Sequence, residues 1–189
     1  TTQTFDDYSS WYHFVVRFDS TQGSASDRLR IYVNGTQIET FNTYTDVNLN
    51  AVDKINLSGN THYIGGAASS QYFHGEMAQT ILSIGYSYAP TTFGEVDSTS
   101  GEWKPLSNPS LTYGTNGFNL SYETSAALGD DTSGNTNDFA VANGTPTQTI
   151  DCPSNNFATI NQLNPQASGY TIGNGNLSVT ANSGDAWRT

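Results

Sequence analysis

The chain has 189 residues, of which only 12% are charged, and six Lys and Arg against seventeen Asp and Glu give a net charge of −11. Such an acidic chain repels phosphate groups, so neither nucleic acid nor an anionic membrane is expected as a partner. Membrane insertion is not expected either, because no apolar run approaches the roughly 18 residues of a spanning helix. The single cysteine, Cys152, cannot form an internal disulfide, so packing or assembly must stabilise the fold.

The first part of the chain predicts a β-hairpin. Aromatic and β-branched residues at 11–18 and 28–33 are typical of strands. Asn34-Gly35 follows the second run directly, and both residues tolerate the positive φ that a type I′ turn requires. A returning strand is expected over residues 36–41.

Three zones follow from the distribution of strands and turns. Residues 1–88 are expected to be rich in strands, including a short strand at 52–57 and a long one from 72 to 86. Residues 89–110 are expected to form a connector, in which Pro90 is favoured at the first position of a single helical turn.

Residues 111–189 are predicted to form an extension rich in Ser, Asn and Gly. This zone has too few apolar residues to form a compact core alone. We expect short strands at 117–122, 139–142, 170–172 and 177–180. The first of these strands is predicted to complete the sheet structure of the first zone.

Several motifs occur in a characteristic order. They are Trp11-Tyr12-His13-Phe14-Val15-Val16, Phe18-Asp19, Arg30-Ile31-Tyr32-Val33-Asn34-Gly35, Tyr63-Ile64-Gly65-Gly66 and Phe73-His74-Gly75-Glu76-Met77-Ala78. In order and spacing they resemble the laminin-G-like, or concanavalin A-like, jelly rolls. The resemblance implies an all-β fold, an antiparallel β-sandwich with an irregular, strand-poor C-terminal extension. Residues 1–88 would then be the C-terminal part of the laminin-G-like sandwich.

Three later segments point to one version of this fold. They are Phe93-Gly94-Glu95-Val96-Asp97, Gly101-Glu102-Trp103-Lys104-Pro105 and Tyr113-Gly114-Thr115-Asn116-Gly117-Phe118. They are similar to the version of the fold found in bacteriophage virion proteins. The resemblance implies a non-enzymatic structural protein of the virion surface, part of a fibre, spike or capsid decoration, with other virion proteins as partners. It would bind host-surface glycans or act as a spacer. The alternative is a bacterial cell-surface or secreted adhesin that binds carbohydrate or protein through the same fold.

The chain departs from the family pattern at both ends. Relatives carry several strands before the tryptophan strand, but only ten residues precede Trp11. Upstream sequence or another subunit is expected to supply the missing strands, and a further domain is expected to follow Thr189. A homo-oligomer is therefore expected, with a trimer as the first choice because the resemblance to phage fibres implies that symmetry.

The oxygen-rich loop at 129–138 has two interpretations. Asp131 and Asn135 are candidate ligands for Ca²⁺, which takes roughly six to eight oxygen atoms. The alternative is a turn in which Asp and Asn side chains cap backbone N–H groups. The loop lacks the bidentate Glu and the spacing of a known calcium loop, which favours the turn. No other cofactor is expected.

No catalytic residues are predicted. A glycoside hydrolase of this fold would need two carboxylates facing one cleft, and the strand expected at 72–86 offers only Glu76. Glu95 and Asp97 have alternate spacing but lie beside the predicted helical turn. The histidines have no Glu or Cys at metal-ligand spacing and are expected to be packed or edge residues: His13, His62 and His74.

Exposed aromatic rings in loops or at strand ends could stack on a sugar. The tyrosines in such positions are Tyr8, Tyr44, Tyr72, Tyr86 and Tyr88. Nothing in the sequence brings them together, so the carbohydrate-binding residues stay unassigned at this level.

Overall fold

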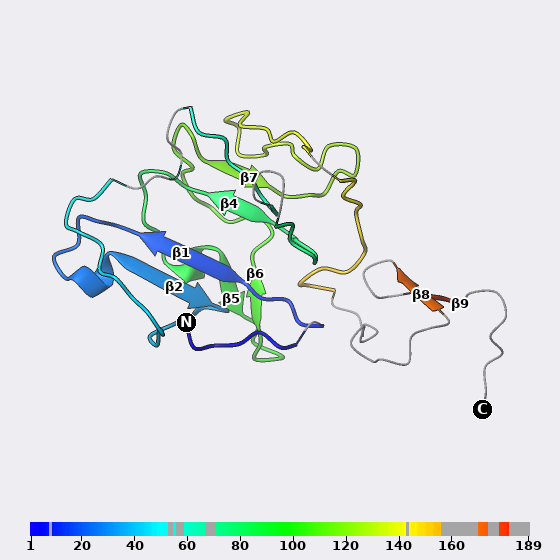
Figure 1. Ribbon diagram of the computed structural model, residues 1–189, viewed down its shortest axis with the longest axis horizontal. Helices are drawn as coiled ribbons and strands as arrows, with labels where there is room; N and C mark the ends of the chain where they lie inside the picture. Colours follow the sequence, from blue (N-terminus) through cyan, green and yellow to red (C-terminus); the bar gives the residue numbers. More distant parts are fainter. Residues whose placement is uncertain are drawn as a thin grey trace.

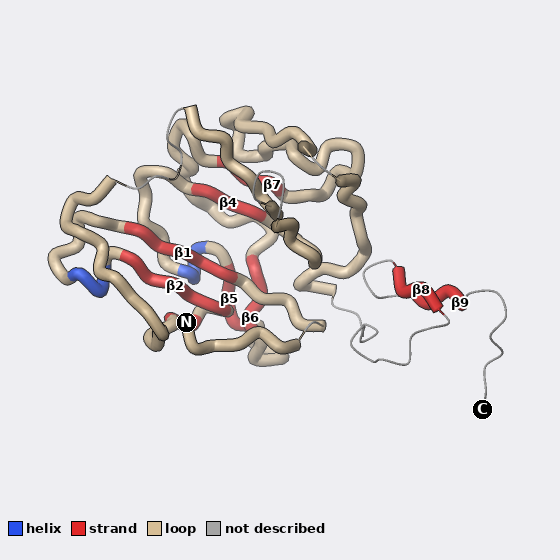
Figure 2. The backbone as a smooth tube through the Cα atoms, in the orientation of Figure 1, coloured by secondary structure: helices blue, strands red, loops and turns tan. Residues whose placement is uncertain are grey.

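The computed structural model describes residues 1–7, 9–52, 55, 59–66, 71–142, 144–155, 170–173 and 178–181. Within these residues the chain forms short β-strands, all paired antiparallel, and two single 3₁₀ turns (Figure 1). The predicted all-β class and antiparallel β-sandwich are confirmed. Loops connect the strands, and residues 121–155 contain no regular strand where they are described (Figure 2).

The first sheet is the predicted hairpin. Its elements are β1 (Phe14–Phe18), the 3₁₀ turn η1 (Ala25–Asp27), β2 (Leu29–Val33) and β3 (Thr36–Gln37). The turn residues Asn34 and Gly35 have φ of 47° and 78°, as the type I′ interpretation requires. The side chain of Asn34 also accepts a hydrogen bond from the backbone N–H of His13 at 2.8 Å. The turn and the residue before β1 therefore fix the register together.

Three further strand pairs make up the rest of the described structure. They are β4 (Thr80–Leu82) with β7 (Phe118–Leu120), β5 (Gly94–Val96) with β6 (Trp103–Pro105), and β8 (Tyr170–Gly173) with β9 (Ser178–Ala181). The 3₁₀ turn η2 (Pro90–Thr92) precedes β5 and has Pro90 in its first turn, as predicted. The pairing of β7 with β4 places a strand of the third zone beside a strand of the first.

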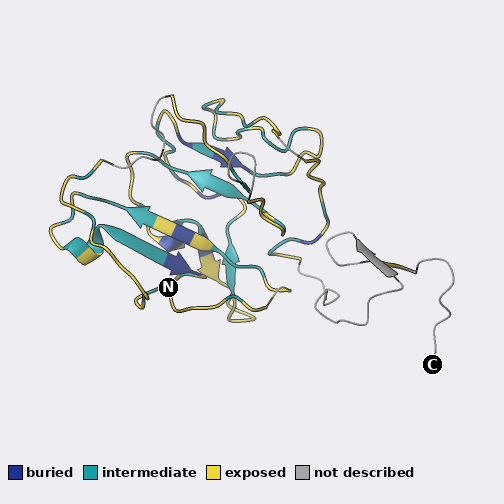
Figure 3. Cartoon of the chain, viewed as in Figure 1, coloured by how far each residue is buried: buried dark blue, intermediate teal, exposed yellow. Residues whose placement is uncertain are grey.

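The core is small and lies under the first sheet and around β7. The buried hydrophobic residues of the described chain are Val15, Tyr32, Val33 and Leu120. Along β1, Val15 is buried whereas its neighbours Phe14 and Val16 are exposed (Figure 3). This alternation is that of a strand whose two faces have different surroundings.

Trp103 of β6 joins the second zone to the hairpin. Its indole Nε1 donates a hydrogen bond to Nδ1 of His13 at 2.8 Å. The indole lies so close to the turn that a Cβ on Gly35 would overlap it, and a Cβ on Gly94 would lie 2.6 Å from its atoms. The absence of side chains at both glycines is what allows this approach.

Several predicted strands are corrected by the structure. The long strand expected at 72–86 is only three residues long, because its partner β7 offers three residues to pair with. The returning strand expected at 36–41 ends at Gln37, and the carbonyl of Thr40 instead accepts the N–H of Thr2 at 3.3 Å.

The strand expected at 139–142 is absent, because Phe139 folds inward against Phe118 with ring centroids 4.9 Å apart. The strand expected at 52–57 falls mainly on residues outside the described part of the chain. In contrast, β5 and β6 were not predicted. The structure contains no described helix that is long and apolar enough to cross a membrane.

Candidate functional site

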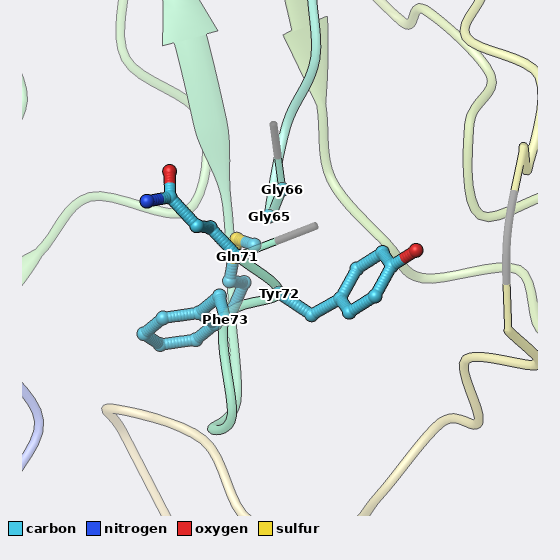
Figure 4. Close-up of a pocket in the computed structure, with 6 residues that line it drawn as sticks. Gly65, Gly66, Gln71, Tyr72 and Phe73 are labelled. Atoms are coloured by element: carbon cyan, nitrogen blue, oxygen red, sulfur yellow. The ribbon is translucent and has the colours of Figure 1, made fainter. Parts of the chain in front are cut away.

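A shallow pocket of about 500 Å³ lies beside the segment that leads into β4 (Figure 4). Its lining residues are Gly65, Gly66, Gln71, Tyr72, Phe73 and Met77. None of these residues carries a charge. The pocket is wide open to solvent, so a ligand would lie on its surface rather than inside it.

The two glycines bring the walls of the pocket together. A Cβ on Gly65 would lie 3.1 Å from the methyl group of Met77, and a Cβ on Gly66 would lie 3.4 Å from the ring of Tyr72. Gly65 has φ of 71°, a conformation that other residues rarely adopt. Its carbonyl accepts the backbone N–H of Phe73 at 2.8 Å, which fixes one side of the pocket to the other.

Gln71 has a strained backbone. Its φ of 61° lies in the left-handed region, where a residue with a Cβ costs roughly 1–3 kcal/mol. Such strain often marks a functional position. Gln71 and Phe73 extend to one side of the backbone and Tyr72 to the other (Figure 4). The side-chain amide of Gln71 and the ring of Phe73 therefore face the same side of the segment.

The pocket can bind a neutral ligand with both apolar and polar faces. Phe73 is 56% exposed and Tyr72 is 49% exposed, so both rings are available for stacking. The amide of Gln71 can donate and accept hydrogen bonds. Aromatic rings with a few polar groups are typical of ligand sites, and a sugar ring offers both apolar C–H faces and hydroxyl groups.

Among the pocket residues, only Tyr72 was a candidate for sugar stacking from the sequence. Gly65, Gly66, Phe73 and Met77 stood only in the motifs of the family resemblance, and Gln71 was missed, because this segment was expected to be the start of a long strand. A usable signal was present in the glycines on either side of the aromatic pair, at Gly66 and Gly75. The ring of Phe73 packs onto Gly75, where a Cβ would lie 2.7 Å from it.

Tyr44, Tyr86 and Tyr88 do not line this pocket. Tyr86 and Tyr88 stack with centroids 5.9 Å apart, and the hydroxyl of Tyr88 accepts the N–H of Thr112 at 2.9 Å. Tyr44 packs against Phe41 with centroids 5.3 Å apart. Tyr8 lies outside the described residues. Tyr72, Tyr86 and Tyr88 nevertheless line one larger surface depression, of which the pocket is a part, and Tyr44 does not.

Asp131, a calcium candidate, caps a turn. Its carboxylate accepts the backbone N–H groups of Asn119, Ser133 and Asn137 at 2.8–2.9 Å, and the hydroxyl of Ser133 at 2.8 Å. Burial alone would raise the pKa of Asp131, but these hydrogen bonds outweigh it and lower the pKa. Both carboxylate oxygens thus accept hydrogen bonds from backbone N–H groups.

Asn135, the second calcium candidate, ties the same turn to the residues before β7. Its Nδ2 donates to the carbonyls of Gly114 at 2.6 Å and Gly117 at 2.9 Å. This is the geometry of the turn interpretation, while the calcium assignment stays a prediction. Among the described residues, no group of three or more His, Cys, Asp or Glu could hold a metal ion.

His13 is packed, as expected for a residue at the start of a strand. Burial lowers its pKa, and its neutral Nδ1 accepts the indole N–H of Trp103. His74 is exposed and lies next to the pocket in sequence. His62 also lies in the described part of the chain, and no metal cluster includes either residue there.

Glu95 and Asp97 lie close after the 3₁₀ turn η2, as expected, with Glu95 within β5 and Asp97 directly after it. Both lie within ion-pair distance of Lys104 Nζ, at 3.5 and 2.9 Å. Glu76 instead interacts electrostatically with Asp151, which is only 8% exposed. This repulsive contact joins two carboxylates that lie 75 positions apart in the chain, so no sequence spacing could have indicated it.

Glu76 is expected to make stability depend on pH. Its Oε1 is buried without a hydrogen-bond partner in the described structure. Burial raises the pKa of Glu76 and the charge of Asp151 raises it further, against a hydrogen bond from Thr149. A raised folded-state pKa means that stability is greatest below the ordinary pKa of Glu and falls as the pH rises through the raised value.

Glu76→Gln should therefore flatten this part of the pH profile and should not lower stability at pH 7. Urea unfolding between pH 4 and pH 8 would measure both effects. Glu102→Gln, which removes the same charge at an exposed site, serves as the control. A profile that is the same for Glu76→Gln and wild type would contradict the assignment.

The fold and the pocket define the chain as an antiparallel β-sandwich protein with a neutral, aromatic-lined surface pocket. Residues 1–82 match the family model of the concanavalin A-like lectin/glucanases superfamily. The matched segment contains the first sheet, all six pocket residues and β4. No curated protein and no solved structure matches the chain.

Proposed function

We propose that the protein binds a neutral saccharide in the pocket around Phe73 and does not cleave it. The observation that carries this proposal is the side-chain amide of Gln71, held by a strained backbone, beside the exposed ring of Phe73 in a pocket without charged residues. The ring would stack on a sugar face while the amide bonds its hydroxyl groups. The superfamily match over the same residues supports a carbohydrate ligand.

Phe73→Ala should weaken saccharide binding by about tenfold, since a lost stacking contact of about 1.4 kcal/mol has that effect. A glycan array would identify the saccharide, and isothermal titration calorimetry would measure the affinities. Tyr44→Ala is the matched control, because Tyr44 is 39% exposed and lines neither the pocket nor the larger depression around it. Equal losses for the two variants would contradict the pocket assignment.

A second variant separates weaker binding from misfolding, because Phe73→Ala could lose binding simply by destabilising the fold. Gln71→Gly keeps the left-handed backbone without strain and removes the amide. It should therefore unfold at least as high in temperature as wild type while binding more weakly. If Gln71→Gly binds the saccharide with the affinity of wild type, the amide of Gln71 does not contact the ligand.

The non-enzymatic part of the proposal has its own test. Glu95 and Asp97 contact Lys104, so neither stands as an unpaired carboxylate in this arrangement. Incubation with the bound saccharide should release no reducing sugar. Cleavage that Glu76→Gln abolishes would make the protein a glycoside hydrolase instead.

We further propose a place on the virion surface, as a component of a fibre, spike or capsid decoration. The resemblance of residues 93–118 to phage virion proteins supports this setting, as does the low charge content. Neighbouring genes for capsid, portal or tail proteins would support it. A signal peptide or sorting signal on the full-length chain would favour the bacterial adhesin.

A further inference from the structure

The outer edge of β1 is free to pair with another strand. At one end of the ladder with β2, Asn34 donates its N–H to the carbonyl of His13 at 2.9 Å. At the other end, Asp19 donates its N–H to the carbonyl of Arg28 at 2.7 Å. Bonded pairs alternate along an antiparallel ladder, so the even-numbered residues of β1 direct their N–H and C=O groups away from β2. These outward residues are Phe14, Val16 and Phe18, and no described residue bonds to their backbone groups.

The outer edge of β4 is free in the same way. Asn119 of β7 gives its N–H to the carboxylate of Asp131 at 2.8 Å, and its carbonyl accepts the N–H of Thr132 at 2.8 Å. Asn119 therefore does not bond to the backbone of Ile81, which lies opposite it across the ladder. The N–H and C=O of Ile81 point away from β7, and nothing in the described part of the chain bonds to them.

Both free edges line the larger surface depression that contains the pocket. All five residues of β1 contribute to it, as do Ile81 and Leu82 of β4. The arrows of β1 and β4 point the same way in Figure 1. One strand running between them in the opposite direction would be antiparallel to both, which is the pairing of all the described ladders.

The larger depression is acidic. Among the described residues that line it, nine are Asp or Glu, whereas Arg17 and Lys104 are the only Lys or Arg. Lys104 is already within ion-pair distance of Glu95, one of those carboxylates. A segment that binds here is therefore favoured by Lys and Arg and opposed by Asp and Glu.

We propose that β1 and β4 bind an extended segment of another polypeptide chain, which adds a strand between them. Its backbone would bond to the outward groups of both strands, as peptides do at exposed sheet edges. Alternate apolar side chains of the segment would cover Phe14 and Val16, which are 52% and 62% exposed. Lys or Arg at its ends would face the carboxylates. The proposal does not depend on saccharide binding, because the pocket around Phe73 includes no residue of either edge.

A fluorescent peptide of alternating Val and Thr with a Lys at each end tests the chemistry of the partner. Fluorescence anisotropy should show that it binds the wild-type protein at least about tenfold more tightly than the same peptide with a Glu at each end. A version N-methylated at every second residue loses its backbone donors toward one edge and should not bind. Equal binding of any two of these peptides, or no binding of the Lys peptide at millimolar concentration, would overturn the proposal.

Val16→Pro should weaken binding of the Lys peptide by at least about tenfold. The N–H of Val16 points away from β2, so proline removes no hydrogen bond of the ladder, and sheets tolerate proline at such edge positions. Val16→Thr is the matched control, since threonine is also β-branched and keeps the N–H. Thermal unfolding would show that both variants fold. A folded Val16→Pro protein that binds like wild type would overturn the proposal.

Amide hydrogen exchange measured by NMR tests both edges without any substitution. Binding of the Lys peptide should slow exchange at the outward amides, which are those of Phe14, Val16, Phe18 and Ile81. Val15 and Arg17 should change less, because their N–H groups already bond to β2. Slower exchange on β1 alone would overturn the placement between two strands. Slow exchange at the outward amides of the full-length polypeptide without peptide would show that the same chain supplies the strand, which also overturns the proposal.

Discussion

Trp103→Ala is expected to lower the free energy of unfolding by about 3 kcal/mol, near the low end for loss of a large aromatic side chain. Trp103 is half-buried and links two parts of the fold. Its ring covers the backbone of Gly35 at the hairpin turn and of Gly94 in β5, and its N–H is bound by His13. Alanine would leave a void between glycines that have no side chains to fill it. Urea denaturation monitored by circular dichroism would measure the loss.

Trp103→Phe separates packing from hydrogen bonding. Phenylalanine keeps a ring near Gly94 but removes the donor to His13, so a loss of about 1 kcal/mol is expected. The difference between the two variants gives the contribution of the ring. A Trp103→Ala protein as stable as wild type would show that the contact between β6 and the hairpin does not stabilise the fold.

The elements that the sequence predicts well are those that depend on neighbouring residues. Asn34-Gly35 encodes its own positive φ values, and Pro90 encodes the start of η2. Neither prediction needs knowledge of distant contacts. The hairpin register follows directly, because a two-residue turn leaves one way to pair the flanking strands.

Strand lengths were harder to predict because a strand needs a partner. The apolar sequence before β4 is compatible with a long strand, yet β7 pairs with only Thr80–Leu82. The β5–β6 pair was missed for the converse reason. Gly94–Val96 has little strand character alone, and it is held by Trp103 and Lys104 across the ladder.

The pocket could not be derived from spacing, because it depends on backbone approach. Gly65 and Gly66 become informative only when Met77 and Tyr72 are known to lie against them. The strain at Gln71 is likewise a property of the folded chain, since glutamine has no preference for positive φ. By contrast, the turn interpretation of the 129–138 loop used residue types whose short side chains cap nearby N–H groups, which is the geometry at Asp131.

Asp131→Ala is expected to cost about 3 kcal/mol of unfolding free energy, because several hydrogen bonds to a charged group are lost together. Leaving the N–H of Asn119 without an acceptor costs the most, because Asn119 lies in β7 and is only 6% exposed. The N–H groups of Ser133 and Asn137 would lose their acceptor as well. Hydrogen bonds from Thr132, Asn135 and Asn137 would then be left to hold the loop against β7 and the residues before it.

The pH dependence of stability gives an independent measure of Asp131. Because its folded-state pKa is lowered, its contribution is fully present above the ordinary pKa of Asp and is lost as the pH falls through the lowered value. Wild type should therefore lose stability in acid, and Asp131→Ala should lose less on the same titration. Asp130→Ala is the matched control, since Asp130 is the exposed neighbouring carboxylate.

Calcium distinguishes the two interpretations of this loop. If Asp131 serves only the backbone, added Ca²⁺ should leave the melting temperature of wild type unchanged, because both carboxylate oxygens already accept hydrogen bonds. If Asp131 and Asn135 bind the ion, Ca²⁺ should raise the melting temperature of wild type and Asp130→Ala but not of Asp131→Ala. A loss below about 1 kcal/mol in Asp131→Ala, with no calcium effect, would contradict the capping role.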